Sequence, residues 1–297
     1  MPVYEIPFDV PDGFRREAIN LAGKALQERF NRENKENDRH GSFRWIKTEL
    51  TYPAFDHFTF ACGNQVFPVF VELIRDGVSL MQDKERARLV EAAAANRLVP
   101  CLWKMNIVSL RRSFVNRVFC GKPPAGDHFR MEPADANGWN LWDARTGARI
   151  VPSALATDER IEMSEWELRN FAIKIVRDDL AEKGWNVTSF CDVVEIDPQI
   201  WFLDDKGRAC WALVRFLKNP EDDDFHKWVG YEEKDTRLKA YDGFFAGVGA
   251  ASAEPVLFDK SGEIVPLSER FTGKAPLWRG DGLCIRYGGL KRIYVAD

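Results

Sequence analysis

Apolar residues recur every three to four positions after Asp12 and predict the first helix. The segment GFRREAINLAGKALQERF places its apolar residues on one stripe, and the polar run NRENKENDRHG ends it. Strand-like segments follow in SFRWIKTELTY and in FDHFTFACGNQVFPVFVELI, which a tight turn at Gly63 and Asn64 divides in two. From Asp83, the alanine-rich DKERARLVEAAAANRL predicts a second helix, and VPCLWKMNI predicts another strand. The order is α, β, β, β, α, β.

The second half of the chain shows a pattern of the same order. SEWELRNFAIKIVRDDLAEKGW predicts a helix, because Ser164 and Glu167 have the spacing of a capping box and one face is apolar. WNVTSFCDVVEI, DPQIWFLDD and RACWALVRFL predict three strands, the last two joined by a turn at 205–207. After the acidic loop NPEDDD, we interpret YEEKDTRLKAYDGFFAGVGAA as a helix and EPVLFD as a returning strand.

These patterns predict an α/β (α+β) protein with two tandem αβββαβ units, each a small mixed sheet flanked by helices. The predicted N-terminal unit spans 1–157 and ends in a hairpin, and the C-terminal unit spans 158–297 with a hairpin extension. Similar segments in the two halves indicate an internal duplication. One echo pairs RLVPCLW with AEPVLFD, and another pairs NLWDARTGARIVP with VLFDKSGEIVP. The two echoes imply different alignments, and the sequence leaves both open.

The composition excludes several classes of protein. A chain of 297 residues, with 45% apolar and 30% charged residues, belongs to a folded globular protein. No stretch approaches the roughly 20 apolar residues of a membrane span, and the start MPVYEIPFDVPDG lacks the pattern of a signal peptide. We therefore expect a cytoplasmic protein with no membrane partner. The six cysteines are far apart, without a CxxC pair, and predict buried reduced thiols.

The net charge of −4 makes nucleic acid a less favoured partner, because the whole-molecule field weakly repels a polyphosphate. Binding would need a local basic patch. The best candidate is LRRSFVNR, which contains Arg111, Arg112 and Arg117. A basic run at helical spacing is more often a solvated face than a phosphate site. The charge therefore favours another protein as the partner.

The αβββαβ order, with an Asp at the head of one strand and an acidic residue near the end of the next, resembles the PD-(D/E)xK nuclease core. In that family, the two acidic residues hold a divalent metal ion, and a Lys two residues later orients or activates the attacking water. In the first half, Asp56 and Glu72 match the acidic positions, whereas Ile74 takes the place of the Lys. The adjacent His57 could assist a metal site.

The second half retains less of this motif. Asp197 matches the first acidic position, but Val214 or Arg215 occupies the second and no E-x-K is present. An apolar side chain cannot orient a water, and a guanidinium cannot bind a cation. We therefore expect no cofactor. If nuclease chemistry is retained, Asp56 and Glu72 are the catalytic and metal-binding residues, with Mg²⁺ or Mn²⁺ as cofactor; otherwise they are a turn cap and a strand-end carboxylate.

Tryptophan is frequent, with ten residues in the chain. Most fall in predicted helices or strands, where core packing explains them. Trp139 and Trp142 in ANGWNLWD, and Trp278 and Arg279 in PLWRGDG, lie in turn-rich segments. These four are our candidate partner-binding residues, because aromatic residues and Arg are favoured at interface centres.

The leading hypothesis is a non-catalytic, cytoplasmic protein-interaction protein built from two degenerate nuclease-like units. The sequence leaves enzymatic activity open, although the missing lysines argue against it. The alternative is a divalent-metal-dependent nuclease with its site in the N-terminal unit. A third hypothesis, a protein that sequesters a basic toxin or nucleic-acid enzyme, rests on the loop NPEDDD and the net charge.

Overall fold

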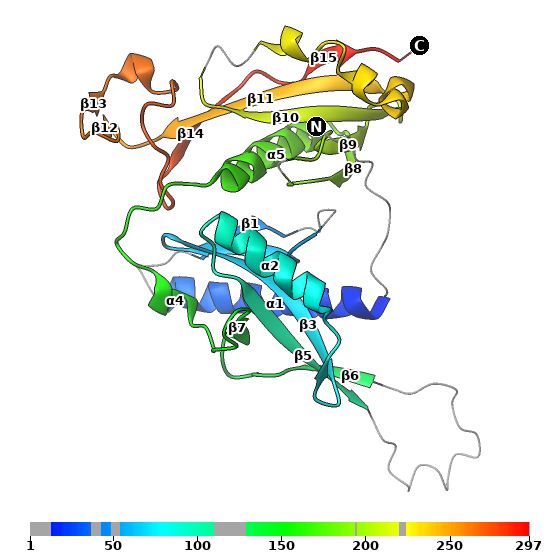
Figure 1. Ribbon diagram of the computed structural model, residues 1–297, viewed down its shortest axis with the longest axis vertical. Helices are drawn as coiled ribbons and strands as arrows, with labels where there is room; N and C mark the ends of the chain where they lie inside the picture. Colours follow the sequence, from blue (N-terminus) through cyan, green and yellow to red (C-terminus); the bar gives the residue numbers. More distant parts are fainter. Residues whose placement is uncertain are drawn as a thin grey trace, which may run out of the picture. The chain divides into compact units, whose positions relative to one another are not determined.

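The computed structural model describes residues 13–36, 43–48, 54–109, 129–193, 195–219 and 224–296 (Figure 1). The chain divides into two compact units. The described residues within 10–48 and 55–156 form the N-terminal unit, and those from 157 onward belong to the C-terminal unit. Each unit has its own mixed sheet, which confirms the α+β class with two sheets flanked by helices.

The N-terminal unit contains one sheet and two long helices. Its elements are α1 (Gly13–Glu36), β1 (Arg44–Lys47), β2 (Phe58–Cys62), β3 (Gln65–Arg75), β4 (Val78–Ser79), α2 (Asp83–Ala95), β5 (Cys101–Ser109), β6 (Phe129–Pro133), β7 (Leu141–Asp143) and α4 (Pro152–Leu155). The strand order is β1-β2-β3-β5-β6, with β4 beside β3 and β7 beside β5. Strands β1, β2 and β3 are antiparallel, and β5 runs parallel to β3. This is the αβββαβ order that the sequence predicts.

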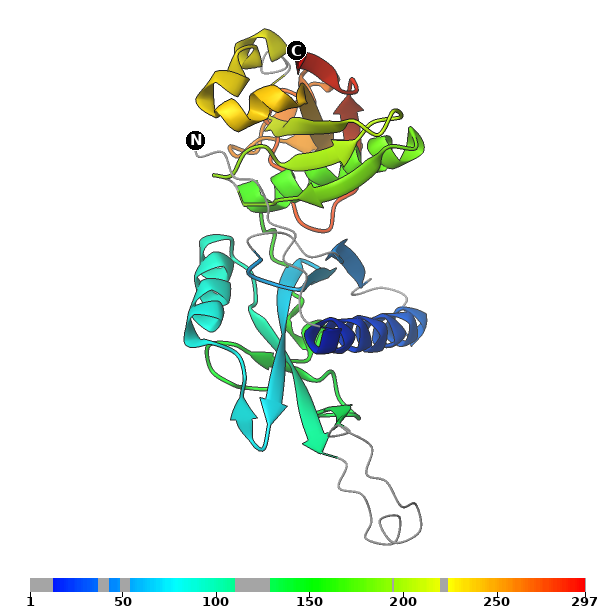
Figure 2. The same cartoon turned by 90° about the vertical axis from the view of Figure 1, so that its right-hand side faces the viewer.

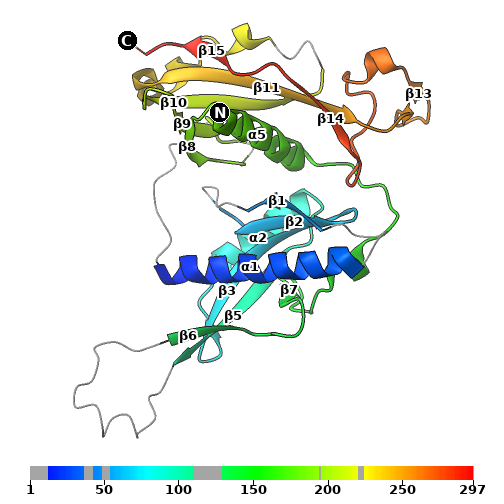
Figure 3. The same cartoon turned by 180° about the vertical axis from the view of Figure 1, so that it is seen from behind.

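Helices α1 and α2 cover opposite faces of this sheet (Figures 1 and 3). The predicted apolar stripe of α1 is buried at Ala18, Ala22, Leu26 and Phe30. The Phe30 ring lies 4.9 Å from that of Phe60 in β2, so aromatic contacts join the helix to the sheet. Strand β3 is buried on both faces along most of its length, as expected of a central strand.

The C-terminal unit repeats this order with a different crossover. Its elements are α5 (Glu165–Glu182), β8 (Asn186–Phe190), β9 (Ile200–Leu203), β10 (Ala209–Leu217), the 3₁₀ helices η2 (Phe225–Trp228), η3 (Tyr231–Lys234) and η4 (Thr236–Ala240), β11 (Asp242–Ser252), β12 (Leu257–Phe258), β13 (Ile264–Val265), η5 (Leu267–Glu269), β14 (Leu283–Tyr287) and β15 (Lys291–Tyr294). The sheet order is β14-β11-β10-β9-β8, with β15 also beside β11. Strands β8, β9 and β10 are antiparallel, and β11 is parallel to β10.

Apolar side chains pack against both faces of the sheet in the C-terminal unit (Figure 2). Helix α5 packs on one face through Ala172, Ile173 and Val176, and the three 3₁₀ helices cover the other face. The capping box of α5 forms as predicted, since the Glu167 N–H donates to the Ser164 hydroxyl and the Ser164 N–H to the Glu167 carboxylate.

Two predictions about the C-terminal unit are wrong. The segment 231–240 forms short 3₁₀ helices in place of an α-helix, and the returning parallel strand is β11 (Asp242–Ser252). EPVLFD instead contributes β12 to a separate two-stranded hairpin with β13. The echo of RLVPCLW in AEPVLFD therefore fails, because β11 occupies the place that β5 has in the N-terminal unit.

The other echo is visible as two similar turns. In NLWDARTG, the Asp143 carboxylate accepts hydrogen bonds from the N–H groups of Arg145 and Thr146. In VLFDKSGE, Asp259 accepts them from Ser261 and Glu263. An aspartate thus binds the N–H two residues later in each turn, and the second N–H lies three residues later in one and four in the other.

The glycine at position 243 lets β11 pass close to a bulky side chain of β10. A Cβ atom at this position would lie 2.2 Å from the Trp211 ring of β10. The same indole donates its N–H to the carbonyl oxygens of Leu238 and Tyr241, 3.2 and 3.1 Å away. Trp211 therefore fixes both the strand and the 3₁₀ segment before it.

Two smaller predictions can also be compared with the fold. Of the described cysteines, Cys62, Cys101, Cys191 and Cys210 are buried free thiols, as predicted, and Cys284 is partly exposed. No helix within the described ranges has the length and apolarity needed to cross a membrane. The basic run with Arg111, Arg112 and Arg117 and most of the loop NPEDDD lie outside the described residues.

Candidate functional site

Asp56 precedes β2 in a bend and is completely buried. Its carboxylate accepts hydrogen bonds from the Lys47 ammonium at the end of β1 and from the Thr59 hydroxyl. The Lys47 side chain is itself buried. A basic group from a neighbouring strand therefore compensates the buried charge of Asp56 directly.

Glu72 is buried in β3, not exposed at a strand end. Its Oε1 accepts hydrogen bonds from the Ser79 hydroxyl at 2.6 Å and from Arg86 of α2 at 3.0 Å. Lys104 stands directly across from Glu72 on β5, with its Nζ 3.9 Å from the Glu72 Oε2. That Oε2 has no hydrogen-bond partner among the described residues. Glu72 thus lies in a cationic environment with one oxygen atom unbonded.

His57 has a structural role beside Asp56. Its Nδ1 accepts a hydrogen bond of 2.8 Å from the backbone N–H of Val71 in β3. Burial, and to a lesser extent the charges of Arg15 and Lys47, lower the pKa of His57 to about 3. The ring is therefore neutral and serves as an acceptor that completes the β2–β3 edge.

The C-terminal unit repeats this hydrogen-bond arrangement with another residue. The Gln199 Oε1 accepts the backbone N–H of Val214 at 2.7 Å, as His57 accepts that of Val71. Val214 therefore corresponds to Val71, and the next residue, Arg215, corresponds to Glu72. By the same alignment, Pro198 corresponds to Asp56, so Asp197 lies one residue before that position.

Asp197 is fully buried and has three partners. Its carboxylate accepts hydrogen bonds from Arg215 and from the Tyr231 hydroxyl, each at 2.8 Å, and from the Gln199 amide. Burial by itself raises the pKa of Asp197, but Arg215, Gln199 and Tyr231 together hold the pKa below its ordinary value. Arg215 also lies over the Trp228 ring, 4.5 Å from its centroid. The guanidinium thus neutralises the charge of the Asp197 carboxylate directly.

Arg169 of α5 belongs to the same charged region. Its side chain is buried, and its guanidinium forms no hydrogen bond to any described residue. Burial, followed by the like charge of Arg215, lowers the pKa of Arg169, and Asp197 opposes this effect. A buried nitrogen without a hydrogen-bond partner is costly, so we expect Arg169 to reduce the stability of this unit.

The four candidate partner-binding residues occupy different environments. Arg279 is buried and forms a two-point ion pair with Glu167 of α5, at 2.7 and 2.9 Å, so it is not an exposed anchor. Trp139 is buried against Phe43, with ring centroids 4.8 Å apart. Trp142 and Trp278 are half-buried. Arg279 and Trp139 are therefore buried, whereas Trp142 and Trp278 are partly accessible.

No group of three or more His, Cys, Asp or Glu side chains among the described residues is arranged to hold a metal ion. Asp56 and Asp197 each contact a basic group directly. The chemistry evident at both sites is charge neutralisation inside a folded unit. Lys104 is the lysine beside Glu72, and it comes from the neighbouring strand β5.

Comparison with known proteins gives one match. Residues 166–293 match a family model described as a domain of unknown function, DUF8840. The C-terminal unit is similar to this domain from α5 to β15. No curated protein and no solved structure matches the chain. The DUF8840 match includes Asp197, Arg215 and Tyr231, and its description names no activity.

Proposed function

We propose that the protein is a non-enzymatic, cytoplasmic interaction protein, built from two duplicated units that resemble degenerate PD-(D/E)xK nuclease cores. The observation that carries the proposal is the Arg215–Asp197 ion pair, in which Arg215 stands at the position that corresponds to Glu72. A nuclease needs two free carboxylates that meet at one hard cation. In the C-terminal unit a guanidinium stands at the position of Glu72 and neutralises the Asp197 carboxylate, which argues against a metal ion there.

The shared strand topology supports the duplication. In each unit, three antiparallel strands are followed by a fourth strand that runs parallel to the third. The side-chain acceptors His57 and Gln199 bind equivalent backbone N–H groups.

The hairpin of β12 and β13 supports a role in protein binding. Leu257 and Val265 pair across the hairpin and are buried, whereas Phe258 and Ile264 pair on the other face, 46% and 66% exposed. The neighbouring Leu267 is 74% exposed. Contiguous exposed apolar side chains on a small hairpin are typical of a protein-binding surface.

The proposal can be tested by affinity purification of the tagged full-length protein from its native cells. The Ile264→Asp variant should lose a partner that the wild type and the Val295→Asp control retain. Val295 has a similar exposure, 57%, at a different place in the unit. The identified partner should then bind the purified variant at least tenfold more weakly in calorimetry. A partner profile that is identical for all three proteins would refute the hairpin as the binding surface.

A second candidate function is a divalent-metal-dependent nuclease in the N-terminal unit. The observation that favours it is Lys104, whose ammonium lies near the unbonded Oε2 of Glu72. With Asp56 displaced from Lys47, the two carboxylates would bind Mg²⁺ or Mn²⁺ and Lys104 would orient the water. Metal-dependent cleavage of DNA or RNA that is lost in Asp56→Ala, Glu72→Ala and Lys104→Met would establish this activity and overturn the non-enzymatic proposal.

A further inference from the structure

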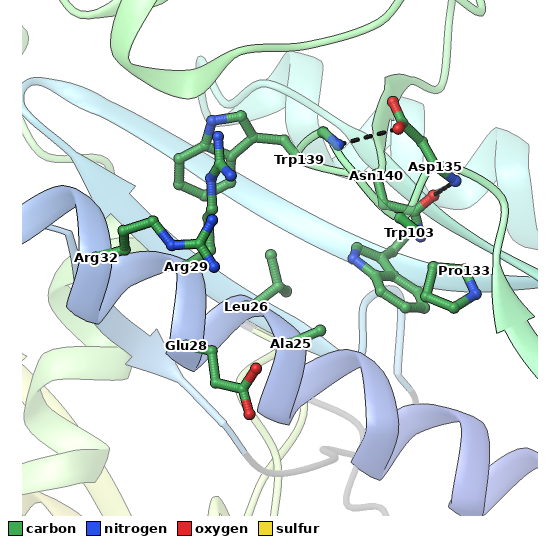
Figure 4. A pocket seen from close by; sticks show the side chains of 12 residues that line it. Ala25, Leu26, Glu28, Arg29, Arg32, Trp103, Pro133, Asp135, Trp139 and Asn140 are labelled. Atoms are coloured by element: carbon green, nitrogen blue, oxygen red, sulfur yellow. Dashed lines mark hydrogen bonds between the residues drawn. The ribbon is translucent and has the colours of Figure 1, made fainter.

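A groove lies between α1 and the edge strand β1. Its volume is about 360 Å³. The buried side chains of Ile19 and Phe58 give the groove an apolar base, and Trp45 of β1 lines one side. The opposite flank of α1 borders a smaller cavity of about 130 Å³, which Figure 4 shows beside Arg32. Of the two, only the groove reaches the roughly 300–1,000 Å³ typical of ligand sites, so it can take an amino-acid side chain.

The wall that Trp45 forms is fixed by contacts within the N-terminal unit. The Trp45 indole N–H donates a hydrogen bond of 2.6 Å to Gln27 of α1, and the ring lies 4.7 Å from that of Phe30 and 5.9 Å from that of Phe58. On the α1 side, Gly23 has no side chain, and a Cβ atom there would lie 3.2 Å from the Phe58 ring. A partner that enters this groove therefore orders few side chains, which lowers the cost of binding.

The groove adjoins an unpaired edge of the sheet. Strand β1 has β2 on one side and no described strand on the other. Trp45 in β1 and Thr48 directly after it both line the groove. An extended peptide that pairs with an edge strand gains backbone hydrogen bonds, and its alternate side chains lie on the same face. The arrangement therefore favours an extended peptide with one apolar side chain in the groove.

The charges around the groove favour an acidic partner. Lys24 is the one charged residue in its lining, and it is exposed. Arg16 of α1 and Arg44 of β1 are exposed as well, and none of the three forms an ion pair with a described residue. Glu17 and Glu28 of α1 do not line the groove. Pairing of β1 with the β1 of a second copy would bring these cations of both copies together, which disfavours self-association.

We propose that the groove between α1 and β1 binds an extended acidic peptide segment of another protein. The peptide pairs with the free edge of β1, one apolar side chain enters the groove against Ile19 and Phe58, and a carboxylate beside it binds Lys24. This surface does not depend on the hairpin of β12 and β13. The two surfaces belong to different units, so the failure of one leaves the other standing.

The test uses the full-length protein and short synthetic peptides. In Glu-Val-Phe-Val-Glu with blocked ends, alternation places both carboxylates on the same face as the Phe ring. The Trp45 indole N–H signal, followed by NMR after ¹⁵N labelling and assigned with Trp45→Phe, reports binding because this N–H lies beside the groove. We expect a Kd on the order of 0.1–1 mM for so short a peptide.

Three control peptides separate the parts of the proposal. Glu-Val-Ala-Val-Glu lacks the apolar anchor, and Lys-Val-Phe-Val-Lys reverses the charge. Each should bind at least fivefold more weakly than the first peptide. A version of the first peptide with N-methylated valines keeps every side chain but loses two backbone donors, so it should also bind at least fivefold more weakly.

Two charge-reversal variants on α1 complete the test. Lys24→Glu should weaken binding of the acidic peptide at least fivefold and make the basic peptide the better ligand. Arg32→Glu makes the same change of charge beside the cavity of Figure 4 and should leave the preference unchanged.

Several results would overturn the proposal. Equal binding of the acidic and basic peptides, equal effects of the two variants, full binding of the N-methylated peptide, or an unmoved Trp45 signal would each do so. A dimer in gel filtration that the acidic peptide dissociates would mean that a second copy occupies the groove, and this too would contradict the assignment.

Discussion

The backbone N–H groups of Val71 and Val214 each donate a hydrogen bond to a side chain and not to the backbone of a neighbouring strand. The acceptors are His57 in one unit and Gln199 in the other, at 2.8 and 2.7 Å. The two side chains share only an acceptor atom at a similar reach. An imidazole and an amide can therefore each accept the N–H, but only the imidazole can also bind a proton, so a pH effect is expected of His57 alone.

The first prediction concerns the stability that His57 gives at neutral pH. Its pKa is about 3 in the folded protein and about 6.5 in the unfolded chain. The unfolded state therefore binds the proton more readily, and the free energy of unfolding falls as the pH drops from 6.5 toward 3. At pH 5.5 the loss from this group is about 1.4 kcal/mol relative to pH 7.5 or above.

The His57→Gln variant keeps an acceptor for Val71 but has no proton to bind. Its free energy of unfolding should therefore fall less than that of the wild type between pH 7.5 and 5.5, by about 1.4 kcal/mol, in urea denaturation. His57→Leu, which leaves the N–H unpaired, should cost about 1–3 kcal/mol at pH 7.5. Identical pH dependence of His57→Gln and the wild type would contradict the neutral buried ring.

The second prediction concerns Arg169. Because its buried guanidinium has no hydrogen-bond partner among the described residues, Arg169→Met should raise the free energy of unfolding by about 1–2 kcal/mol. The comparison is Arg160→Met at an exposed position, which should change it by less than about 0.5 kcal/mol. Urea denaturation measures both. Destabilisation by Arg169→Met would mean that the guanidinium is stabilised by its surroundings.

At this scale, the sequence located the acidic residues and missed their partners. Asp56, Glu72 and Asp197 are acidic residues in or next to strand-like segments, so the strand pattern alone singles them out. Lys47 and Tyr231 reach these carboxylates from other elements. Strand register and side-chain direction decide those contacts, and neither is encoded in a short spacing rule.

At the scale of elements, local signals were sufficient where the element depends on its own residues. Helix α5 begins at a capping box formed by Ser164 and Glu167, and the structure confirms both hydrogen bonds. The crossover at 231–240 was missed because its conformation depends on Trp211, which holds two of its carbonyl groups from β10. A tertiary contact overrides helix propensity there.

The third prediction tests the packing of β11 on Trp211. Gly243→Ala should destabilise the protein by about 1–3 kcal/mol, because a Cβ atom would overlap the indole ring. Gly249→Ala is the matched control on the same strand, where the nearest atom would be 3.5 Å away, and it should have a smaller effect. Urea denaturation compares them. Gly243→Ala should be partly rescued by Trp211→Phe; equal effects of the two alanine variants would contradict the packing argument.

At the scale of the whole molecule, the separate cores predict independent folding. The C-terminal unit has apolar layers on both faces of its sheet, and the DUF8840 match begins and ends within it. A fragment of residues 157–297 should therefore unfold cooperatively in urea, with a circular dichroism spectrum of mixed helix and strand. A gradual transition without a baseline would show that this unit needs the rest of the chain.

The buried cysteines can report the local opening of each sheet separately. Burial raises the pKa of Cys62, and that of Cys210, to about 11, so few thiolates exist at neutral pH and a reagent must wait for an opening event. Cys62 and Cys101 sit in one sheet, and Cys210 sits in the other. The rate of alkylation at each cysteine, measured by mass spectrometry over time, would therefore report the opening rate of each sheet separately in the wild-type protein.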